Sequence, residues 1–170
     1  MKKVLIVIDM QNDFINGALG TPEAEKIVPL VKAKIEEAQA NGDIIVYTRD
    51  THYENYLETP EGKKLPVKHC IKGTPGWEIE KSLYIDRAKI FDKPTFASLD
   101  LVHDLVAAPC SEVEIVGLCT DICVVSNALL IKAYLPELEI VVDSQCCAGV
   151  TPESHLAALE TMKMCQITVK

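Results

Sequence analysis

The sequence predicts an α/β protein with three layers (αβα), in which helices cover both faces of a doubly wound, mostly parallel sheet of six strands. Short continuous apolar runs, typical of strands buried on both faces, alternate along the chain with longer segments whose apolar residues recur at helical spacing. This alternation is typical of a parallel sheet with helical crossovers. The chain has 170 residues and shows no internal repeat or linker, so we expect one domain over residues 1–170.

Each expected strand is a short run rich in valine, isoleucine and leucine that stops at a polar residue or a turn. The first run is cut off by Asp9, so it is too short for a signal peptide or a membrane span and is interpreted as a strand. Gly117 is expected to end the fourth strand, and Asp143 the fifth. The six expected strands are residues 3–8, 44–48, 88–91, 113–116, 138–142 and 167–169.

The longest expected helix lies between the first two strands, over residues 23–41, and Gly42 marks its end. Its apolar face consists of Ile27, Leu30, Val31, Ile35 and Ala38. Between residues 53 and 77 the periodicity is lost among prolines and glycines, which predicts a long loop of the kind that is usually functional. Further helices are expected at 78–83, 99–107 and 152–164, the last of them capped by Thr151.

Composition excludes several classes of protein. The 17 basic and 25 acidic residues give a net charge of −8, which argues against a general nucleic-acid or anionic-membrane binder. The seven cysteines are odd in number, irregularly spaced and not preceded by a secretory signal. They predict free thiols in a reducing, cytoplasmic compartment. No C-x-x-C pair occurs, so neither a zinc ribbon nor a thioredoxin-type centre is indicated.

Residues 114–130 read as a buried strand, a tight turn and a helix whose first turn carries Cys123. Thr120 or Asp121 is expected to cap this helix. A helix N-terminus favours an anion, and with a nearby cation it can lower the pKa of a thiol and make it a nucleophile. The alternative is that Cys123 is a small apolar residue that packs the helix against the sheet.

Polar residues also end the other central strands: Asp9 follows the first, Asp50 and His52 the second, and Lys93 the third. The carboxyl ends of parallel strands meet at one edge of a sheet, where ligands bind. A thiol at this edge has the partners that it needs for attack. A carboxylate can take its proton, and a lysine can stabilise the negative charges of the carboxylate and the thiolate. Backbone N–H groups of the turn can receive an oxyanion. The set suits cleavage of an amide through a thioester.

Three segments resemble those of the isochorismatase-like cysteine hydrolases, in particular the nicotinamidase branch. They are I-D-M-Q-N-D-F at 8–14, F-D-K-P-T-F-A-S at 91–98 and G-L-C-T-D-I-C-V at 117–124. The resemblance implies the isochorismatase-like hydrolase fold, with Asp9, Lys93 and Cys123 as the catalytic triad. It also implies a cis peptide at Leu118–Cys119 and an oxyanion hole built from the backbone amides of Cys119 and Cys123.

Members of the nicotinamidase branch also bind a divalent metal beside the thiol. This metal can coordinate a pyridine nitrogen and a few waters. Residues 49–52 and 68–74 resemble its metal segments, which implies Asp50, His52 and His69 as ligands. Glu61 is the expected further ligand, with Glu58 as the alternative. Such ligands suit Zn²⁺, and Fe²⁺ or Mn²⁺ are also compatible. The other possibility is a metal-free site, as in isochorismatase-type and carbamoyl-amide relatives.

By the same resemblance, Phe14 and Phe96 line a small apolar slot for the substrate. Trp77 is a candidate to close over this slot, although core packing explains all three aromatic residues equally well. The expected activity is hydrolysis of nicotinamide, or a similar small amide, to acid and ammonia, a step of NAD salvage. Alternatives are a carbamoyl-amide or isochorismate-like substrate, or a non-catalytic binding or thiol-sensing protein. The resemblance also implies a homo-oligomer. The apolar stretch 146–150 then has two alternative places, in a subunit contact or in the core.

Overall fold

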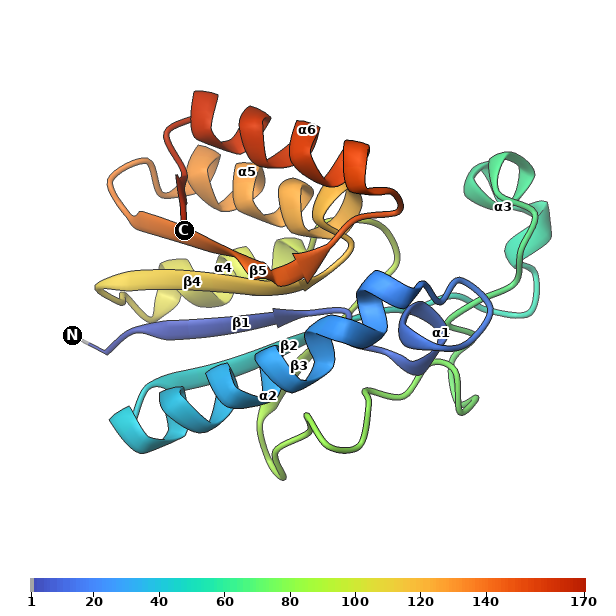
Figure 1. Ribbon diagram of the computed structural model, residues 1–170, viewed down its shortest axis with the longest axis horizontal. Helices are drawn as coiled ribbons and strands as arrows, with labels where there is room; N and C mark the ends of the chain where they lie inside the picture. The colour runs from blue at the N-terminus through green and yellow to red at the C-terminus, as the bar shows by residue number, and fades with distance from the viewer. Residues whose placement is uncertain (1) are drawn as a thin grey trace.

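A single sheet of six parallel strands forms the middle of the molecule, in the order β3-β2-β1-β4-β5-β6 (Figure 1). The computed structural model describes residues 2–170. Because β1 and β4 are central, the chain winds outward from them in both directions, and the predicted doubly wound α/β class is confirmed. The strands are β1 (Val4–Ile8), β2 (Ile44–Asp50), β3 (Lys89–Lys93), β4 (Glu112–Leu118), β5 (Glu139–Ala148) and β6 (Thr168–Val169).

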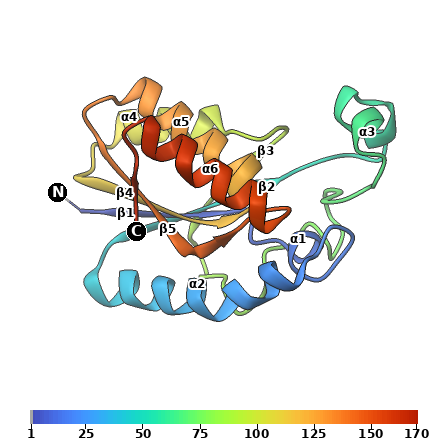
Figure 2. The same cartoon turned by 45° about the horizontal axis from the view of Figure 1, so that its top comes forward.

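Helices cover both faces of this sheet (Figures 1 and 2). On one face lie α4 (Leu99–Ala107), α5 (Val125–Tyr134) and α6 (Pro152–Met164), whose apolar side chains pack on those of β1 and β4. On the other face lie α1 (Asn12–Ile15) and α2 (Pro22–Asn41), which form a second core cluster with the opposite side chains of the same strands. No helix within residues 2–170 has both the length and the apolar character that a membrane crossing requires.

The long helix α2 has the expected end signals. The Thr21 hydroxyl accepts a hydrogen bond from the N–H of Ala24, and Gly42 ends the helix. Leu30, however, is 45% exposed, so its assignment to the buried face was wrong. The buried positions are Ala24, Ile27, Val31, Ile35 and Ala38, and their narrow stripe leaves Leu30 on its flank.

One further predicted helix and two predicted strand ends were also wrong. Residues 78–83 form no helix, because their backbone pairs with the segment after β1: the N–H of Asn12 donates to the carbonyl of Glu78, and the N–H of Glu80 donates to that of Met10. Gly117 lies inside β4. Asp143 lies inside β5, where its carboxylate is 3.1 Å from Lys34 Nζ, so a charged residue does not end this strand.

Because β5 runs on to Ala148, Cys146 and Cys147 are strand residues that point to opposite faces of the sheet. Each is buried, Cys146 in the cluster under α2 and Cys147 in the cluster under α5 and α6. The two cysteines therefore belong to the core rather than to a subunit contact. The predicted helices at 99–107 and 152–164 are confirmed, the latter with Thr151 as its cap.

The connection between β2 and β3 is the long segment 51–88. It contains only a short 3-10 turn, η1 (Tyr56–Glu58), and one short helix, α3 (Pro60–Lys64). In both ribbon views α3 stands away from the layered body, beyond the carboxyl ends of the strands (Figures 1 and 2). The loss of periodicity in the sequence therefore marks a segment that extends over the edge where the polar residues meet.

Candidate active site

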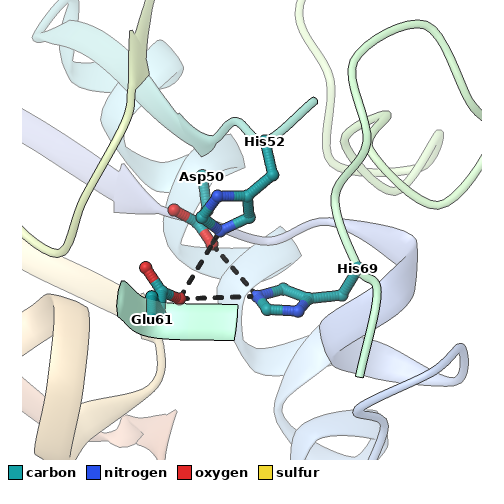
Figure 3. A group of neighbouring side chains, drawn as sticks. All are labelled: Asp50, His52, Glu61 and His69. Carbon is teal, nitrogen blue, oxygen red and sulfur yellow. Dashed lines mark hydrogen bonds and ion pairs between the residues drawn. The ribbon is translucent and has the colours of Figure 1, made fainter. Parts of the chain in front are cut away.

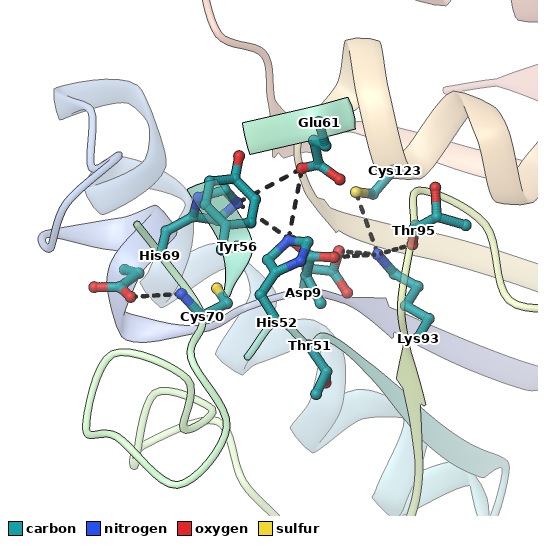
Figure 4. A network of polar contacts seen from close by, with 12 residues as sticks. Asp9, Thr51, His52, Tyr56, Glu61, His69, Cys70, Lys93, Thr95 and Cys123 are labelled. Carbon is teal, nitrogen blue, oxygen red and sulfur yellow. Dashed lines mark hydrogen bonds and ion pairs between the residues drawn. The ribbon is translucent and has the colours of Figure 1, made fainter. Parts of the chain in front are cut away.

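The carboxyl ends of four adjacent strands, β3, β2, β1 and β4, bring the predicted polar residues together (Figure 4). Asp50 and Lys93 are the last residues of β2 and β3 and are paired in register, while Asp9 follows β1 directly. Cys123 lies in a π-helical turn, η2 (Thr120–Val124), that connects β4 to α5. Residues from four separate parts of the sequence thus share one edge because the strands are parallel and adjacent.

Lys93 joins the carboxylate and the thiol. Its Nζ lies 2.6 Å from Asp9 Oδ2 and donates a hydrogen bond of 3.3 Å to Cys123 Sγ, and it also donates to the carbonyl of Thr95 at 3.1 Å. Neither Lys93 nor Asp9 is more than 1% exposed. Burial alone would lower the pKa of Lys93, but the charges of Asp9 and Cys123 raise it overall, so the ammonium form is kept.

Asp9 is held in place by the neighbouring strand. The Thr48 hydroxyl donates to Asp9 Oδ1 at 2.6 Å, and the N–H of Asp9 donates to the carbonyl of Thr48 at 3.2 Å. Asp9 itself adopts a φ of +46°, which turns the chain sharply out of β1. Burial raises the pKa of this carboxyl group, and the nearby ammonium of Lys93 only partly opposes the rise. A carboxylate with a raised pKa accepts protons more readily.

The thiol of Cys123 is also buried, and its environment differs from the expected one. Burial first, and then the negative charge of Asp9, raise the pKa of Cys123 well above its ordinary value, while Lys93 lowers it. The helix terminus and Lys93 therefore do not leave Cys123 with a lowered pKa, because the thiol is out of water. The neutral thiol needs a base at the moment of attack, and the Asp9 carboxyl group lies within hydrogen-bonding reach.

The turn that carries Cys123 is not capped as predicted. The Thr120 hydroxyl contacts His155, and the Asp121 carboxylate accepts from the N–H of Val150, so neither caps the helix. The cis peptide between Leu118 and Cys119, expected from the resemblance, is present.

A second cluster begins at Asp50, whose Oδ1 is 3.7 Å from Lys93 Nζ. Figure 3 shows its four side chains. The cluster consists of four side chains, each of which offers one nitrogen or oxygen atom that can bind a metal, and these four atoms all lie within 4.8 Å of one another. The residues are Asp50, His52, Glu61 and His69. His52 Nε2 is 2.9 Å from Asp50 Oδ2 and 3.6 Å from Glu61 Oε1. His69 Nε2 is 3.5 Å from the same Asp50 oxygen. Glu61, not Glu58, is the glutamate that α3 brings to this cluster.

The tautomer of His69 supports a metal at this point. Its Nδ1 is 2.8 Å from the carbonyl of Val67, which can only accept, so Nδ1 carries the hydrogen and the lone pair of the neutral ring is on Nε2. That lone pair faces the carboxylate of Asp50. Ligands about 2.1 Å from a tetrahedral ion lie roughly 3.4 Å apart, which is close to the separations in this cluster. The four residues therefore fit a divalent cation.

Both groups face the same cavity, which has a volume of about 250 Å³. Cys123 and the cluster residues Asp50, Glu61 and His69 lie in its wall. The remaining wall is mainly apolar and includes Phe14, Leu19, Leu65, Phe96, Ile122 and Val150. The cavity thus joins a thiol, a candidate metal centre and an apolar slot large enough for a small aromatic ring.

Trp77 does not close over the cavity. It is buried in the core cluster under α2, where its Nε1 donates to the Thr51 hydroxyl at 2.9 Å and the Arg49 guanidinium stacks on its ring at 3.6 Å. A tryptophan in a loop rich in glycine and proline looked like a lid, but it anchors that loop to the sheet instead.

Sequence reasoning missed Asn127, a fully buried polar residue of α5. Its Nδ2 donates to the carbonyls of Cys123 at 2.7 Å and Phe96 at 3.1 Å, and its Oδ1 accepts from the N–H of Ser98. It therefore ties the nucleophile turn to the segment that carries Phe96. An asparagine on the apolar face of a helix, four residues after the cysteine, was the available signal.

The isochorismatase domain model matches residues 3–170, nearly the whole chain. The chain belongs to the isochorismatase family. An isochorismatase family protein of Bacillus subtilis is 35% identical to it, over 94% of this chain and 93% of the relative. The nicotinamidase/pyrazinamidase of Mycobacterium tuberculosis is 28% identical, over 97% and 96% of the two chains.

Among solved structures, the pyrazinamidase of Pyrococcus horikoshii in complex with zinc superposes with a TM-score of 0.89 at 33% identity, covering 100% of this chain and 99% of that one. The predicted fold of this isochorismatase-family protein is thereby confirmed. At the level of class, the prediction of a hydrolase acting on amide C–N bonds is confirmed as well.

Proposed function

We propose that this isochorismatase-family protein hydrolyses nicotinamide, or a closely similar aromatic amide, to the acid and ammonia. One observation carries the proposal: Cys123, with Lys93 and Asp9 behind it, and the cluster of Asp50, Glu61 and His69 line the same small cavity. A ring that reaches the cluster at one end can present a carboxamide to the thiol at the other. The names of the relatives agree with such a substrate.

In the first half of the reaction, Asp9 takes the proton of the Cys123 thiol while Sγ attacks the amide carbon. The ammonium group of Lys93, which contacts both Asp9 and Cys123, stabilises the negative charge as it moves from the carboxylate to the sulfur. The backbone N–H groups of Cys119 and Cys123 receive the oxyanion of the tetrahedral intermediate. When that intermediate collapses, the C–N bond breaks, and Asp9 returns its proton to the leaving nitrogen so that ammonia departs.

In the second half, a water molecule attacks the thioester carbon. Asp9 takes a proton from this water, the oxyanion forms again at the same N–H groups, and the C–S bond breaks. The proton held by Asp9 then returns to Cys123. The raised pKa of Asp9 suits both directions of transfer, because the carboxyl group gains and loses a proton in each half-reaction.

Asp50, His52, Glu61 and His69 would hold the divalent cation, and Zn²⁺ is our first choice. Such an ion supplies an anchor for a pyridine nitrogen and polarises bound water. The aromatic side chains of Phe14 and Phe96 are proposed to hold the substrate ring between them. We also propose, from the resemblance alone, a homo-oligomer in the cytoplasm.

The test is ammonia release from a panel of nicotinamide, pyrazinamide, benzamide and a carbamoyl amide. We expect nicotinamide to be cleaved and benzamide, which lacks the ring nitrogen, to be much poorer. Cys123→Ala should lose at least about 10³-fold in turnover, because no other group supplies the nucleophile. Cys119→Ala is the matched control, since this variant keeps its backbone N–H and should stay within about tenfold of wild type. Full activity in Cys123→Ala would refute the proposal.

A further inference from the structure

We propose that His155 is a positioning residue for the nucleophile turn. Acting through the hydroxyl of Thr120, it holds residues 119–123 in the geometry in which their backbone N–H groups receive the oxyanion. The inference rests on the proposed function, since it assigns the control of that reaction to a residue outside the cavity wall. It concerns α6 and the loop before it, to which neither the triad nor the cation site assigns a role.

The contact is short and partly buried. Thr120 Oγ1 lies 2.7 Å from His155 Nδ1, and Thr120 is completely excluded from solvent. Thr120 directly follows Cys119, whose N–H is one of the two proposed oxyanion donors. Fixing the Thr120 side chain therefore limits how far the backbone of the turn can rotate. His155 lies in the first turn of α6, where its own N–H donates to the carbonyl of Thr151, so the ring projects from a rigid element.

A second contact from the same loop acts in parallel. The Asp121 carboxylate accepts from the N–H of Val150 at 3.1 and 3.2 Å. Gly149 packs so closely on His155 that a Cβ at position 149 would lie 2.9 Å from the histidine Cβ. Gly149 and Val150 also line the cavity. Residues 149–155, here called the clamp segment, thus contact the nucleophile turn on one side and the substrate space on the other.

The turn has no cap of its own to fix its orientation. It is a π-helical turn, and among residues 2–170 no side chain caps it. Its backbone N–H groups at Ile122 and Val124 both donate to the carbonyl of Cys119, and contacts of Thr120 and Asp121 with the segment before and at the start of α6 fix how the turn lies. The bulk of a valine would fill the place of Thr120 equally well. A hydroxyl in a fully buried position is therefore explained by its partner, His155.

The first experiment separates positioning from packing. His155→Ala should lower kcat for nicotinamide by about tenfold or more while KM changes less than about threefold, because small displacements of reacting groups are costly. His155→Asn, whose amide can replace Nδ1, should recover kcat to within about threefold of wild type. His103→Ala, which removes an exposed histidine of α4, is the control. If the alanine and asparagine variants lose kcat equally, or if neither loses any, the proposal is wrong.

A second experiment addresses the oxyanion directly, with pyridine-3-carbaldehyde as the probe. The Cys123 thiol adds across the aldehyde: a C–S bond forms, the C=O π bond opens, and the thiol proton passes to Asp9, which leaves a negative oxygen at the backbone N–H groups. Nicotinate is the reference ligand, because it binds without forming this oxyanion. His155→Ala should weaken the binding of the aldehyde by about tenfold and leave the affinity for nicotinate unchanged. Equal weakening of both ligands would contradict a role in positioning the turn.

A third measurement needs no substrate, so it separates failure of this inference from failure of the proposed function. Hydrogen exchange in residues 119–124 should become at least about tenfold faster in His155→Ala, with α6 unchanged and with recovery in His155→Asn. If wild type cleaves no amide but the exchange pattern is as expected, the clamp stands and the function fails. If exchange in the turn does not change, the clamp is wrong whatever the substrate.

Discussion

The ammonium group of Lys93 is completely buried, and the fold tolerates this buried charge because two carboxylates lie close to it. Its Nζ lies 2.6 Å from Asp9 Oδ2 and 3.7 Å from Asp50 Oδ1. Burying an ion costs several kcal/mol, and only close partners with good geometry offset that cost. The three residues come from three adjacent strands, so the charge balance of the site is also a constraint on how those strand ends meet.

Replacing Lys93 with methionine should therefore lower stability as well as activity. We expect the free energy of unfolding to fall by about 3–5 kcal/mol, because the carboxyl group of Asp9 loses its partner. Without Lys93, which lowers the pKa of Asp9, that pKa rises further. A carboxyl group whose pKa is higher in the folded state than in the unfolded chain destabilises the fold increasingly as the pH rises above about 4. Urea unfolding at pH 5 and pH 8 should thus show the larger loss at pH 8.

Two controls accompany this variant. Lys3→Met breaks the exposed pair between Lys3 and Glu112 and should leave the stability almost unchanged, because water screens this pair. The double variant Asp9→Asn/Lys93→Met should lose the additional pH dependence, because the unpaired carboxyl group is gone. Equal losses for the two lysines at both pH values would contradict the account of Lys93.

At the residue level, the sequence was informative where a chemical type and a strand end coincide. Asp9, Lys93 and Cys123 could be selected because the ends of parallel strands must meet, whatever the details of packing. The partners Thr120 and His155 could not be selected, because their contact depends on side-chain directions of residues 35 positions apart. The raised pKa of Cys123 could not be inferred from the sequence for a similar reason, since burial is a property of the folded chain.

Among the elements, β1 and β4 approach each other unusually closely at Gly117. This residue has a φ of +122°, and a Cβ at its position would lie 2.1 Å from the carbonyl oxygen of Ile8. The close approach brings the chain just before Asp9 against the strand that leads to Cys123. Any residue with a Cβ at this position would have to push one strand away from the other.

Gly117→Ala should therefore be severely destabilising, by about 3 kcal/mol or more, because it combines backbone strain with a steric clash. Gly42→Ala is the matched control. Its φ of +70° is also left-handed, but a Cβ there meets no atom of residues 2–170 within 4 Å, so only the backbone strain of about 1–2 kcal/mol is expected. Thermal unfolding of both variants measures the difference. Similar losses would show that the β1–β4 spacing is not the constraint.

Gln11 connects the ends of β1 and β2 beside the candidate cation site. Its Nε2 donates to the carbonyls of Asp50 and Trp77, and its Oε1 accepts from the N–H of Asp50 at 2.7 Å. Gln11→Leu should reduce the affinity for Zn²⁺ by about 10–100-fold, as expected when the support of a ligand is lost. Competition with a chromophoric chelator measures this. Asn12→Leu, which removes a contact to Pro75 at the exposed side of the same motif, is the control.

Element types were predictable where periodicity is strong, and less so where tertiary pairing decides. The helices at 99–107 and 152–164 were predicted with their boundaries, because cap residues and apolar spacing agree. Residues 78–83 have a helical composition, yet their backbone groups bond to the chain that follows β1. The end of β5 was predicted too early, since Asp143 is neutralised by Lys34 from another element.

For the whole molecule, the main division is between the layered body and segment 51–88. The body is held by two apolar clusters, whereas the segment has one short helix and one 3-10 turn. It joins the body through Trp77, Ile79 and Leu83, which are buried in the cluster under α2, and through polar contacts. Three of its residues, His52, Glu61 and His69, belong to the candidate cation cluster. A bound cation would therefore link the segment to the end of β2 at Asp50, and so fix one wall of the cavity.

Removing the cation should accordingly loosen segment 51–88 more than the body. After dialysis against a chelator, we expect limited proteolysis to cut within residues 53–68 at least about tenfold faster, and added Zn²⁺ to restore resistance, because a ligand stabilises the state that binds it. Glu61→Gln should show the faster cleavage at Zn²⁺ concentrations that protect wild type. Glu58→Gln should behave as wild type, since Glu58 lies outside the cluster. Equal cleavage with and without the cation would mean that the segment is held by its Trp77 and Tyr56 packing alone.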